Sequence, residues 1–343
     1  MTLNSRPETV RVQRGTRTGQ MIIVSVDSTV LGPALGGCRI RTYPAWRDGL
    51  DDALRLSSAM TEKAALAGLP YGGGKTVVAL EGPEPRRADL LADVGDLVES
   101  FGGRYLTGPD VGTSPDDMTV LRRTTEHVLC RPESEGGSGD SSGPTAAGVL
   151  ASIEAVRAHR FPGRPLESLS FAVLGLGHVG TLVASHLAAA GARLTVTDID
   201  ASRRTVARGW GATWIDPDRA LGAEADVLVP SAVGGILCPD TIGTLRCGAI
   251  VGAANNQLDA DTTADLLHAR GICWAPDTVV SAGGIVSAIA RERDLVSPDE
   301  AARRVGDIGR RLGEILAAAA RDDVAPLREA RRQVQDLLTP PMV

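Results

Sequence analysis

Residues 171–180 read FAVLGLGHVG, so glycines stand at 175, 177 and 180 directly after a short apolar run. The run predicts a buried parallel strand, and the following residues predict a helix over 179–190. In that context Gly175 permits a tight turn, Gly177 lets a pyrophosphate approach the backbone, and Gly180 allows close packing of helix on strand. The N-terminus of the helix is then the expected pyrophosphate site. The stretch predicts a dinucleotide-binding fold.

The next predicted strand, RLTVTD, ends in Asp198, which lies 18 residues beyond Gly180. A carboxylate at this position accepts a hydrogen bond from the ribose 2′-hydroxyl and repels a 2′-phosphate, which favours NAD over NADP. His178 and Val179 lie inside the glycine stretch, and we expect His178 to lie near the phosphates and to have no catalytic role. The alternative is a glycine turn with a purely structural acid.

Five short apolar runs follow the linker-like part of the chain and alternate with helical patterns. They predict a doubly wound parallel sheet, and their sequences are SFAVLG, RLTVTD, ADVLVP, AIVGAA and GICWAP. Earlier, strands are expected at 21–26, 38–43 and 75–80, with helices at 46–67 and from Pro115 to about Val128. The fold class is therefore α/β with two domains and a catalytic cleft between them.

The domain boundary is placed in residues 132–144, PESEGGSGDSSGP, which are poor in apolar residues and rich in Gly and Ser. We expect a substrate-binding and oligomerisation domain over 1–131 and an NAD-binding domain over 132–321. Two amphipathic helices are expected between 298 and 338, and the segment from about 322 to 343 is expected to pack back on the first domain.

Composition excludes several classes of function. The 343 residues carry a formal net charge of −6 and no long basic run, which disfavours nucleic-acid binding. No segment is long and apolar enough to predict a membrane helix, and the start of the chain does not resemble a secretory signal. The five cysteines are scattered without a CxxC pair, which predicts reduced thiols in the cytoplasm and neither a disulfide framework nor a metal site.

Lysine is almost absent, since 34 of the 36 basic residues are arginine and the two lysines are Lys63 and Lys75. Arginine stays protonated at any working pH, whereas a buried lysine can lose its proton and act as a base. The alternative is that two lysines survive by chance in an arginine-biased chain. Both lie in the first domain, Lys63 late in a predicted helix and Lys75 directly after Gly72-Gly73-Gly74.

Glycine-rich loops surround these lysines and Asp110. Three consecutive glycines usually mark the close approach of a ligand or of another backbone. Asp110 follows another predicted strand, and Gly36-Gly37 precede the strand that begins at Cys38. Such loops predict a site for a small anionic substrate, with one lysine as a charge partner and the other as a general base. Surface lysines with no such role are the alternative.

The chain resembles the glutamate/leucine/phenylalanine/valine dehydrogenase superfamily over roughly residues 30–320, and within it the branch that acts on apolar amino acids, with motifs most like the phenylalanine-type members. The motifs that carry the resemblance are GPALGGCR (32–39), AMTEKAALAGLPYGGGKTVV (59–78), TGPDVGTSPDDM (107–118), the glycine stretch and strand over 171–198, GAANNQL (252–258) and the segment 275–284.

The resemblance implies a role for each matching residue. Lys63 would bind the substrate carboxylate with the backbone of Gly36 and Gly37, Lys75 would activate water for attack on an imine, and Asp110 would exchange protons with the substrate amine. The cofactor would also contact Thr145, Ala232, Asn255 and Asn256. The implied reaction is the reversible oxidation of an L-amino acid by NAD and water to a 2-oxo acid, ammonium and NADH, in a homo-oligomer.

Substrate choice is expected from four pocket positions, Leu35, Gly108, Ile285 and Ala288, none of which is Lys or Arg. A side-chain carboxylate would be unpaired there, so glutamate is disfavoured. Gly108 and Ala288 leave room for a bulky apolar or aromatic side chain, with leucine or valine also possible. The open alternatives are a specialised amino or imino acid as substrate, or an inactive NAD-binding regulatory homologue.

Ser281 departs from the family pattern, which has asparagine where this chain reads Ser-Ala-Gly-Gly over 281–284. The asparagine amide is expected to touch the substrate, and a serine hydroxyl is shorter with fewer donors. Either a water fills the gap, or the substrate is unusual, or the exchange is neutral.

Overall fold

The computed structural model describes residues 6–339 and divides the chain into two compact units. The first unit runs to Ser141 and also includes Ala288–Pro298 and the residues from Val334 onward. The second unit comprises Ser142–Ser287 and Asp299–Gln333. The division at Ser141 thus lies within the Gly- and Ser-rich segment 132–144.

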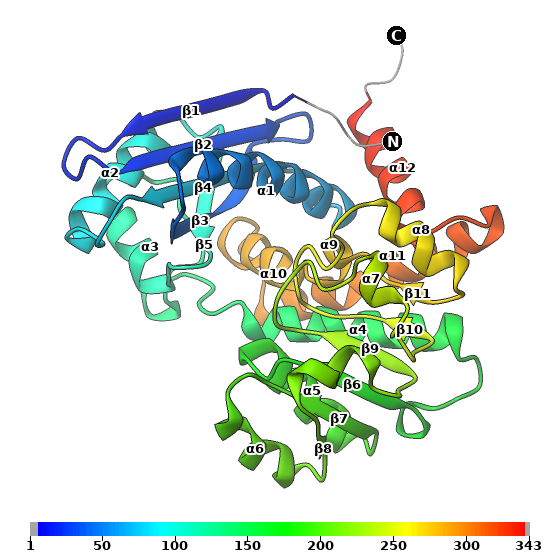
Figure 1. Ribbon diagram of the computed structural model, residues 1–343. Coiled ribbons are helices and arrows are strands. Elements are labelled where there is room, and N and C mark those ends of the chain that lie inside the picture. The colour runs from blue at the N-terminus through cyan, green and yellow to red at the C-terminus, as the bar shows by residue number, and fades with distance from the viewer. Residues whose placement is uncertain (1–5, 340–343) are drawn as a thin grey trace. The chain divides into compact units, whose positions relative to one another are not determined.

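The first unit contains a five-stranded mixed sheet in the order β1-β2-β4-β3-β5 (Figure 1). Its strands are β1 (Thr9–Arg14), β2 (Met21–Ser28), β3 (Ala34–Thr42), β4 (Gly72–Leu80) and β5 (Tyr105–Pro109). β1 and β2 pair antiparallel, as do β2 and β4, whereas β3 runs parallel to both β4 and β5. The expected strands at 21–26, 38–43 and 75–80 all exist, and β3 and β4 begin earlier because their glycines pair as well.

Helices cover both faces of this sheet because its strands alternate side chains between the faces. On one face α1 (Trp46–Leu66) packs on β2 and β4, where Ile23 and Val77 contact Ala53. On the other, Ile22 and Val78 belong to a core with α2 (Arg87–Glu99) and α3 (Pro115–Leu121). Val77 of β4 therefore faces α1, whereas Val78 faces α2 and α3.

Helix α3 is shorter than expected, since it ends at Leu121 and not near Val128. Ser114 caps its start by accepting the backbone N–H of Asp117, as the N-cap pattern predicts. Beyond the helix, the Thr124 hydroxyl donates to the Leu121 carbonyl, and Val128 forms a parallel bridge to Thr107. The pairing with β5 therefore replaces the last turns of the predicted helix.

The second unit contains a six-stranded parallel sheet in the order β11-β10-β9-β6-β7-β8. The strands are β6 (Ser170–Leu174), β7 (Arg193–Thr197), β8 (Thr213–Trp214), β9 (Val227–Pro230), β10 (Ala249–Ile250) and β11 (Cys273–Trp274). Numbered within the unit, this is the order 3-2-1-4-5-6 of the Rossmann fold. The order reverses between β6 and β9, so ligands of such sheets bind at the carboxyl ends of these two strands.

Helices and short 3-10 segments precede, connect or follow these strands. They are α4 (Ser142–Arg160), α5 (His178–Ala189), α6 (Arg204–Gly209), α7 (Pro239–Ile242), α8 (Thr262–Ala269), α9 (Asp277–Val280) and α10 (Gly283–Glu292), with η2 (Leu166–Ser168), η3 (Ala201–Arg203) and η4 (Pro217–Gly222). The segment η1 (Glu133–Glu135) and the part of α10 from Ala288 belong to the first unit. α5 packs on β6 and β7 and against α4.

The two C-terminal helices are α11 (Pro298–Asp322) and α12 (Pro326–Leu338), with the break where the sequence predicts it. Up to Gln333, α12 belongs to the second unit, where Arg328 pairs with Asp265 of α8 at 2.7 Å. This differs from the expectation that the segment from 322 packs on the first domain. Only the residues from Val334 are grouped with the first unit.

Candidate active site

Lys75 and Asp110 form a buried ion pair in the first unit, with Lys75 Nζ 2.7 Å from Asp110 Oδ2. Lys75 lies on β4, on the face covered by α1, and its side chain is only 6% exposed. Asp110 directly follows β5, where its backbone N–H donates to Thr113 Oγ1, which in turn donates to the Cys38 carbonyl. The turn after β5 thus holds the carboxylate against the amine.

Space for this pair comes from Gly37 on β3. A Cβ at Gly37 would lie 2.7 Å from Asp110 Cβ and 3.2 Å from Lys75 Nζ. Distances of this size leave no room for a side chain, so glycine is required for the amine and the carboxylate to meet.

The three glycines of β4 serve backbone packing. A Cβ at Gly72 would lie 1.7 Å from the Ser28 carbonyl oxygen, and one at Gly73 would lie 2.1 Å from Thr61 N on α1. At Gly74 it would lie 2.7 Å from the Tyr105 ring. A run of glycines can mark the close approach of a ligand or of another part of the chain. The structure shows the close approach of other parts of the chain, and at Gly73 this brings α1 directly onto β4.

The electrostatics of the pair favour proton transfer. Burial lowers the pKa of Lys75, the nearby charge of Asp110 raises it, and the nearby charge of Arg39 lowers it, with a net decrease from its ordinary value. Burial raises the pKa of Asp110, but Lys75 and Arg39 outweigh this effect and lower it to about 2. The pair therefore combines a carboxylate that stays ionised with an amine that loses its proton more readily than usual.

Arg39 is a further member of this cluster that the sequence did not single out. Its Nε lies 2.9 Å from Asp110 Oδ2, and its Nη1 lies 2.8 Å from Asp52 Oδ2 on α1. Asp52 also accepts from Tyr43 Oη at 2.7 Å and pairs with Arg55 at 2.6 Å. The sequence could have indicated Arg39 through the alternation of side chains along β3. Arg39 stands two residues after Gly37 and therefore lies on the same face of the sheet.

The other residues expected to bind the substrate carboxylate also lie in this unit. Lys63 is half-buried near the C-terminal end of α1, two residues after Thr61, which packs on Gly73. Gly36 lies on β3 beside Gly37, and a Cβ on it would lie 1.7 Å from the Gly74 carbonyl oxygen. Lys63 thus lies on α1 and Gly36 on β3, two elements that adjoin β4.

In the second unit, the glycine stretch lies at the point where the strand order reverses. Gly175 has φ +101°, and a Cβ on it would lie 2.6 Å from Ala232 Cβ, which follows β9. A Cβ on Gly180 would lie 2.0 Å from the Gly175 carbonyl oxygen. Within the described chain nothing lies within 4 Å of such an atom on Gly177, so this backbone is open to a ligand.

Asp198 directly follows β7 and faces the same loop. Its Oδ2 accepts from Leu176 N at 2.6 Å, and its Oδ1 accepts from Asp200 N at 2.8 Å. His178 and Val179 occupy the first turn of α5, which begins at His178. The glycine loop after β6, the start of α5 and Asp198 thus lie together at the carboxyl ends of β6 and β7.

A third cluster forms around Ser281 in the second unit. The Ser281 hydroxyl lies 2.6 Å from the Asp277 carbonyl oxygen and 3.2 Å from Asn255 Oδ1, and the Asn256 N–H donates to Asp277 Oδ2. Asn256 has φ +53°, a left-handed conformation that asparagine tolerates. The serine therefore contacts the asparagine side chain expected near the cofactor.

Thr145 is held beside this cluster by Gly283. A Cβ at Gly283 would lie 2.0 Å from the Pro144 carbonyl oxygen and 3.1 Å from Thr145 Cα. The structure thus brings Thr145 and the Ser281–Gly284 turn together.

Four positions were expected to line the side-chain pocket. Leu35 and Ala288 are buried, at 4% and 2% exposure, and belong to the first unit. Gly108 lies on β5 in register with Gly37, so both face the same side of the sheet. Ile285 belongs to the second unit.

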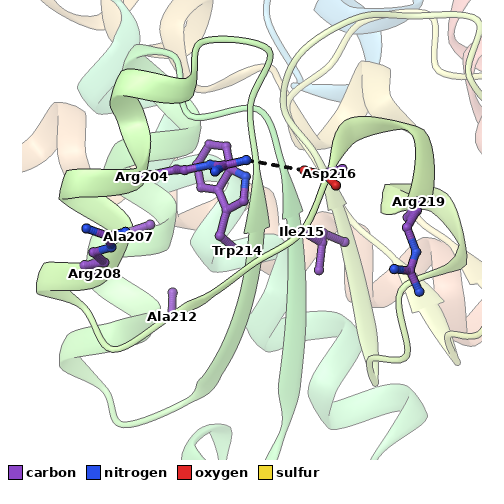
Figure 2. Close-up of a pocket in the computed structure, with 8 residues that line it drawn as sticks. All are labelled: Arg204, Ala207, Arg208, Ala212, Trp214, Ile215, Asp216 and Arg219. Carbon is purple, nitrogen blue, oxygen red and sulfur yellow. Dashed lines mark hydrogen bonds and ion pairs between the residues drawn. The ribbon is translucent and has the colours of Figure 1, made fainter.

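A pocket of about 450 Å³ lies elsewhere in the second unit and contains none of the expected site residues (Figure 2). In it, Arg204 stacks over Trp214 at 5.1 Å and pairs with Asp216 at 3.3 Å. The residues that line it are Arg204, Ala207, Arg208, Ala212, Trp214, Ile215, Asp216 and Arg219.

Residues 6–339 contain no group of three or more His, Cys, Asp or Glu placed to hold a metal ion. No helix in that range has the length and apolar character needed to cross a membrane.

Comparison with known proteins agrees with this geometry. Residues 8–127 match the Glu/Leu/Phe/Val dehydrogenase dimerisation domain, and residues 195–296 match the Glutamate/Leucine/Phenylalanine/Valine dehydrogenase family. Phenylalanine dehydrogenase of Lysinibacillus sphaericus is 38% identical over 93% of this chain and 85% of its own length. Leucine dehydrogenase of Bacillus cereus is 36% identical over 93% and 87%.

A solved structure agrees as well. L-tryptophan dehydrogenase of Nostoc punctiforme superimposes with a TM-score of 0.82 at 34% identity, over 97% of this chain and 96% of that one. Fold and site thus define an amino-acid dehydrogenase, an oxidoreductase of small molecules. The chain belongs to the glutamate/leucine/phenylalanine/valine dehydrogenase family, as its motifs predicted.

Proposed function

We propose that this protein catalyses the reversible, NAD-dependent oxidative deamination of an apolar L-amino acid to its 2-oxo acid and ammonium. The observation that carries the proposal is the buried contact of Lys75 Nζ with Asp110 Oδ2, at 2.7 Å. A general base works best when its pKa lies near the working pH, and burial moves the pKa of Lys75 in that direction.

The residues of the first unit divide the proton chemistry between them. Lys63, with the backbone of Gly36 and Gly37, binds the substrate carboxylate. Asp110 moves a proton to and from the substrate amine. Uncharged Lys75 accepts the proton of the water that adds to the imine carbon, and the resulting ammonium ion of Lys75 returns that proton in the reverse direction.

The second unit supplies the residues for NAD, which accepts the hydride of the substrate α-carbon when bound. Gly175, Gly177 and Gly180 with the start of α5 hold the pyrophosphate, and Asp198 accepts the ribose hydroxyl. Thr145, Asn255 and Asn256 contact the nicotinamide end. Ser281 contacts the side chain of Asn255 at 3.2 Å, while its one hydroxyl proton is donated to the Asp277 carbonyl oxygen at 2.6 Å.

Two strongly exposed apolar side chains add support for a dinucleotide. Ile199 follows β7 and is 93% exposed, and Val233 follows β9 and is 66% exposed. Both stand at the carboxyl ends of strands that flank β6, where the flat apolar faces of adenine would cover them. The sequence did not single out either residue, because exposure cannot be read from an apolar letter.

The preferred substrate has an aromatic or bulky apolar side chain. Relatives of 38% and 34% identity are named for phenylalanine and tryptophan, and Gly108 leaves open the face of the sheet that Gly37 and Lys75 share. Leucine and valine remain possible substrates, since another relative of 36% identity is a leucine dehydrogenase.

The active form is proposed to be a homo-oligomer assembled through the first unit. Residues 8–127 match a family model described as a dimerisation domain. Strand β1 lies at the edge of the sheet and carries Val10 and Val12, each 37% exposed. Exposed apolar residues on an edge strand suit pairing with a second chain.

The proposal is tested by NADH formation from Phe, Trp, Leu, Val, Ile, Met and Glu at alkaline pH, with the wild type, Lys75→Ala and Arg86→Ala. Arg86 is a matched control because its side chain is 76% exposed and pairs only with Asp89 among the contacts seen. We expect turnover of Phe or another apolar substrate and a loss of roughly a hundredfold or more in Lys75→Ala alone.

Other outcomes distinguish the rival functions. If the folded wild type turns over none of the seven amino acids, the substrate is a specialised amino or imino acid, or the protein is an inactive NAD-binding homologue. Calorimetry of NAD binding, followed by a wider substrate panel, would separate these two functions. Full activity of Lys75→Ala would contradict the mechanism. Strong turnover of Glu would contradict the apolar pocket.

A further inference from the structure

We propose that Arg39 is a positioning residue that fixes the Asp110 carboxylate against Lys75 and tunes the protonation of both. The inference rests on the proposed deamination, because it concerns the groups that transfer protons in it. Arg39 contacts Asp110 directly, and its effect on the reaction passes through that carboxylate.

Lys75 and Arg39 contact the same carboxylate oxygen of Asp110. Asp110 Oδ2 lies 2.7 Å from Lys75 Nζ and 2.9 Å from Arg39 Nε. Hydrogen bonds from two cations to one carboxylate oxygen fix its position more closely than one bond does, and charge-assisted bonds are the strongest of this type. With Arg39 removed, the Asp110 side chain keeps the lysine as its single cationic side-chain partner in the described structure.

Arg39 is itself held in place by a second carboxylate, that of Asp52. Its Nη1 bonds Asp52 Oδ2 on α1 at 2.8 Å, while its Nε bonds Asp110 in the turn after β5. The guanidinium is thus held at two different edges. The side chains of Arg39 and Asp52 are only 15% and 13% exposed. A planar guanidinium held at two edges cannot rotate away, whereas a lysine offers only a point charge.

Two further residues hold Asp52 in turn. Tyr43 Oη bonds the same Asp52 oxygen at 2.7 Å, and Arg55 bonds the other at 2.6 Å. A chain of contacts thus links α1 through Asp52 and Arg39 to Asp110 and Lys75. Proton transfer groups that are held in this way do not need to reorganise when the substrate binds.

Arg39 also acts through its charge. Besides the mutual effect of Lys75 and Asp110, the groups that act on the pair are Arg39 and Cys38, whose buried thiol has a pKa raised to about 12 and stays neutral. Arg87 and Asp117 act on Cys38. A positive charge at Arg39 lowers the pKa of Lys75 and lowers the pKa of Asp110. Its removal is therefore expected to raise both values.

The experiment compares Arg39→Gln and Arg39→Lys with Arg41→Gln. Arg41 is a matched control because it stands two residues further on the same strand, on the same face, and is exposed, with its guanidinium over the Tyr43 ring. The first measurement is the pH profile of kcat/KM. The second uses protein grown with ¹³C-lysine, which gives two Cε signals in the wild type and in Arg39→Gln and three in Arg39→Lys, and Lys63→Arg and Lys75→Arg in each background assign them.

We expect Arg39→Gln to lower kcat/KM by roughly tenfold to a hundredfold, and to move the Lys75 titration upward by about one pH unit. Arg39→Lys keeps the charge and loses the two-edged contact, so its Lys75 titration stays near that of the wild type while kcat/KM stays low. Arg41→Gln should change neither quantity.

Unchanged kcat/KM and an unmoved Lys75 signal in Arg39→Gln would overturn the proposal. A loss of activity without movement of the Lys75 signal would also overturn it, because a merely structural role predicts that result. Should the wild type turn over no amino acid, the proposed function fails, and the Lys75 titration still decides whether Arg39 controls the pair.

Discussion

Gly37 on β3 faces Lys75 on β4 so closely that a Cβ on the glycine would lie 3.2 Å from the lysine Nζ. The same atom would lie 2.7 Å from Asp110 Cβ. The contact between the lysine and the aspartate therefore depends on a missing side chain on the neighbouring strand. This relationship gives the glycine a role in the Lys75–Asp110 contact that is independent of its backbone conformation.

Gly37→Ala should separate the pair, because the added Cβ would lie 2.7 Å from Asp110 Cβ and 3.1 Å from the Pro109 carbonyl oxygen, so the turn after β5 must move. We expect kcat/KM to fall by roughly tenfold to a hundredfold, since misplaced proton-transfer groups lose rate steeply. Gly209→Ala in α6 is the control, because no described atom lies within 4 Å of its added Cβ. A Gly37→Ala enzyme with wild-type kcat/KM would show that the space is not needed.

The pH dependence of deamination should follow Lys75. Because the pKa of Lys75 is lowered, the uncharged base is present at lower pH than the ordinary value of about 10.4 allows, and kcat/KM should rise through a limb below that value. Asp110, with a pKa of about 2, stays ionised throughout. Rates measured from pH 6 to 11 test this, and a limb at or above the ordinary lysine value would contradict it.

The sequence predicted the second unit well because its signals are local. The glycines at 175, 177 and 180 and the acid at 198 each act within one strand–turn–helix segment, so their spacing alone specifies the geometry. The regular alternation of strand and helix also predicted a doubly wound parallel sheet and five of its six strands. Strand β8 was missed, since its two residues, Thr213 and Trp214, are too few to make a pattern.

The first unit was harder, because its site is assembled across strands. The motifs located Lys75, Asp110 and Gly37, but the contact of Arg39 with Asp110 depends on how β3 lies between β4 and β5, which no local spacing contains. Likewise, Val128 pairs with Thr107 across more than twenty positions, and this tertiary contact ends the helix that the sequence predicted to continue.

Acid stability should depend on Asp93, which lies on α2 at 2% exposure and accepts the backbone N–H groups of Arg17 and Thr18 at 3.0 and 2.9 Å. Burial raises its pKa, but hydrogen bonds from the Thr18 hydroxyl, the Arg17 side chain and these two backbone N–H groups outweigh the effect and lower it. A lowered folded pKa means that the stabilisation is present above the unfolded pKa of about 3.9 and disappears as the pH falls through the folded value.

We therefore expect Asp93→Asn to reduce the free energy of unfolding by about 2 kcal/mol at pH 7, and by less below pH 4, where the wild type also loses its charge. Asp96→Asn is the control, because Asp96 is 49% exposed and bonds only the Arg17 guanidinium among the contacts seen. Urea unfolding at pH 7 and pH 3 measures both variants. An equal loss at the two pH values would exclude the charge as the cause.

Cofactor choice should depend on Asp198. Asp198→Asn keeps an oxygen for the Leu176 N–H and removes the negative charge that repels a 2′-phosphate. We expect the KM for NAD to rise by about tenfold and the ratio of kcat/KM for NADP to that for NAD to increase. Asp200→Asn, two residues later at the start of η3, should leave this ratio unchanged. Equal discrimination in Asp198→Asn and wild type would remove Asp198 from the ribose site.

Substrate size should depend on Gly108. A Cβ on Gly108 would lie 3.8 Å from the nearest described atom, the Leu129 carbonyl oxygen, so alanine fits the fold without strain. Because Gly108 pairs in register with Gly37, the added methyl group enters the face of the sheet that Lys75 occupies. It should therefore exclude part of a large substrate side chain and leave the unfolding midpoint unchanged.

We expect Gly108→Ala to lower the ratio of kcat/KM for phenylalanine to that for leucine by about tenfold, since one methyl group in such a pocket is worth about 1–3 kcal/mol. Gly103→Ala is not a useful control because φ is +83° there, whereas Gly209→Ala adds the same methyl group in a helix far along the chain and should leave the ratio at its wild-type value. A wild-type ratio in Gly108→Ala would mean that the substrate side chain lies against another part of the first unit, and the preference for a bulky substrate would then need a different cause.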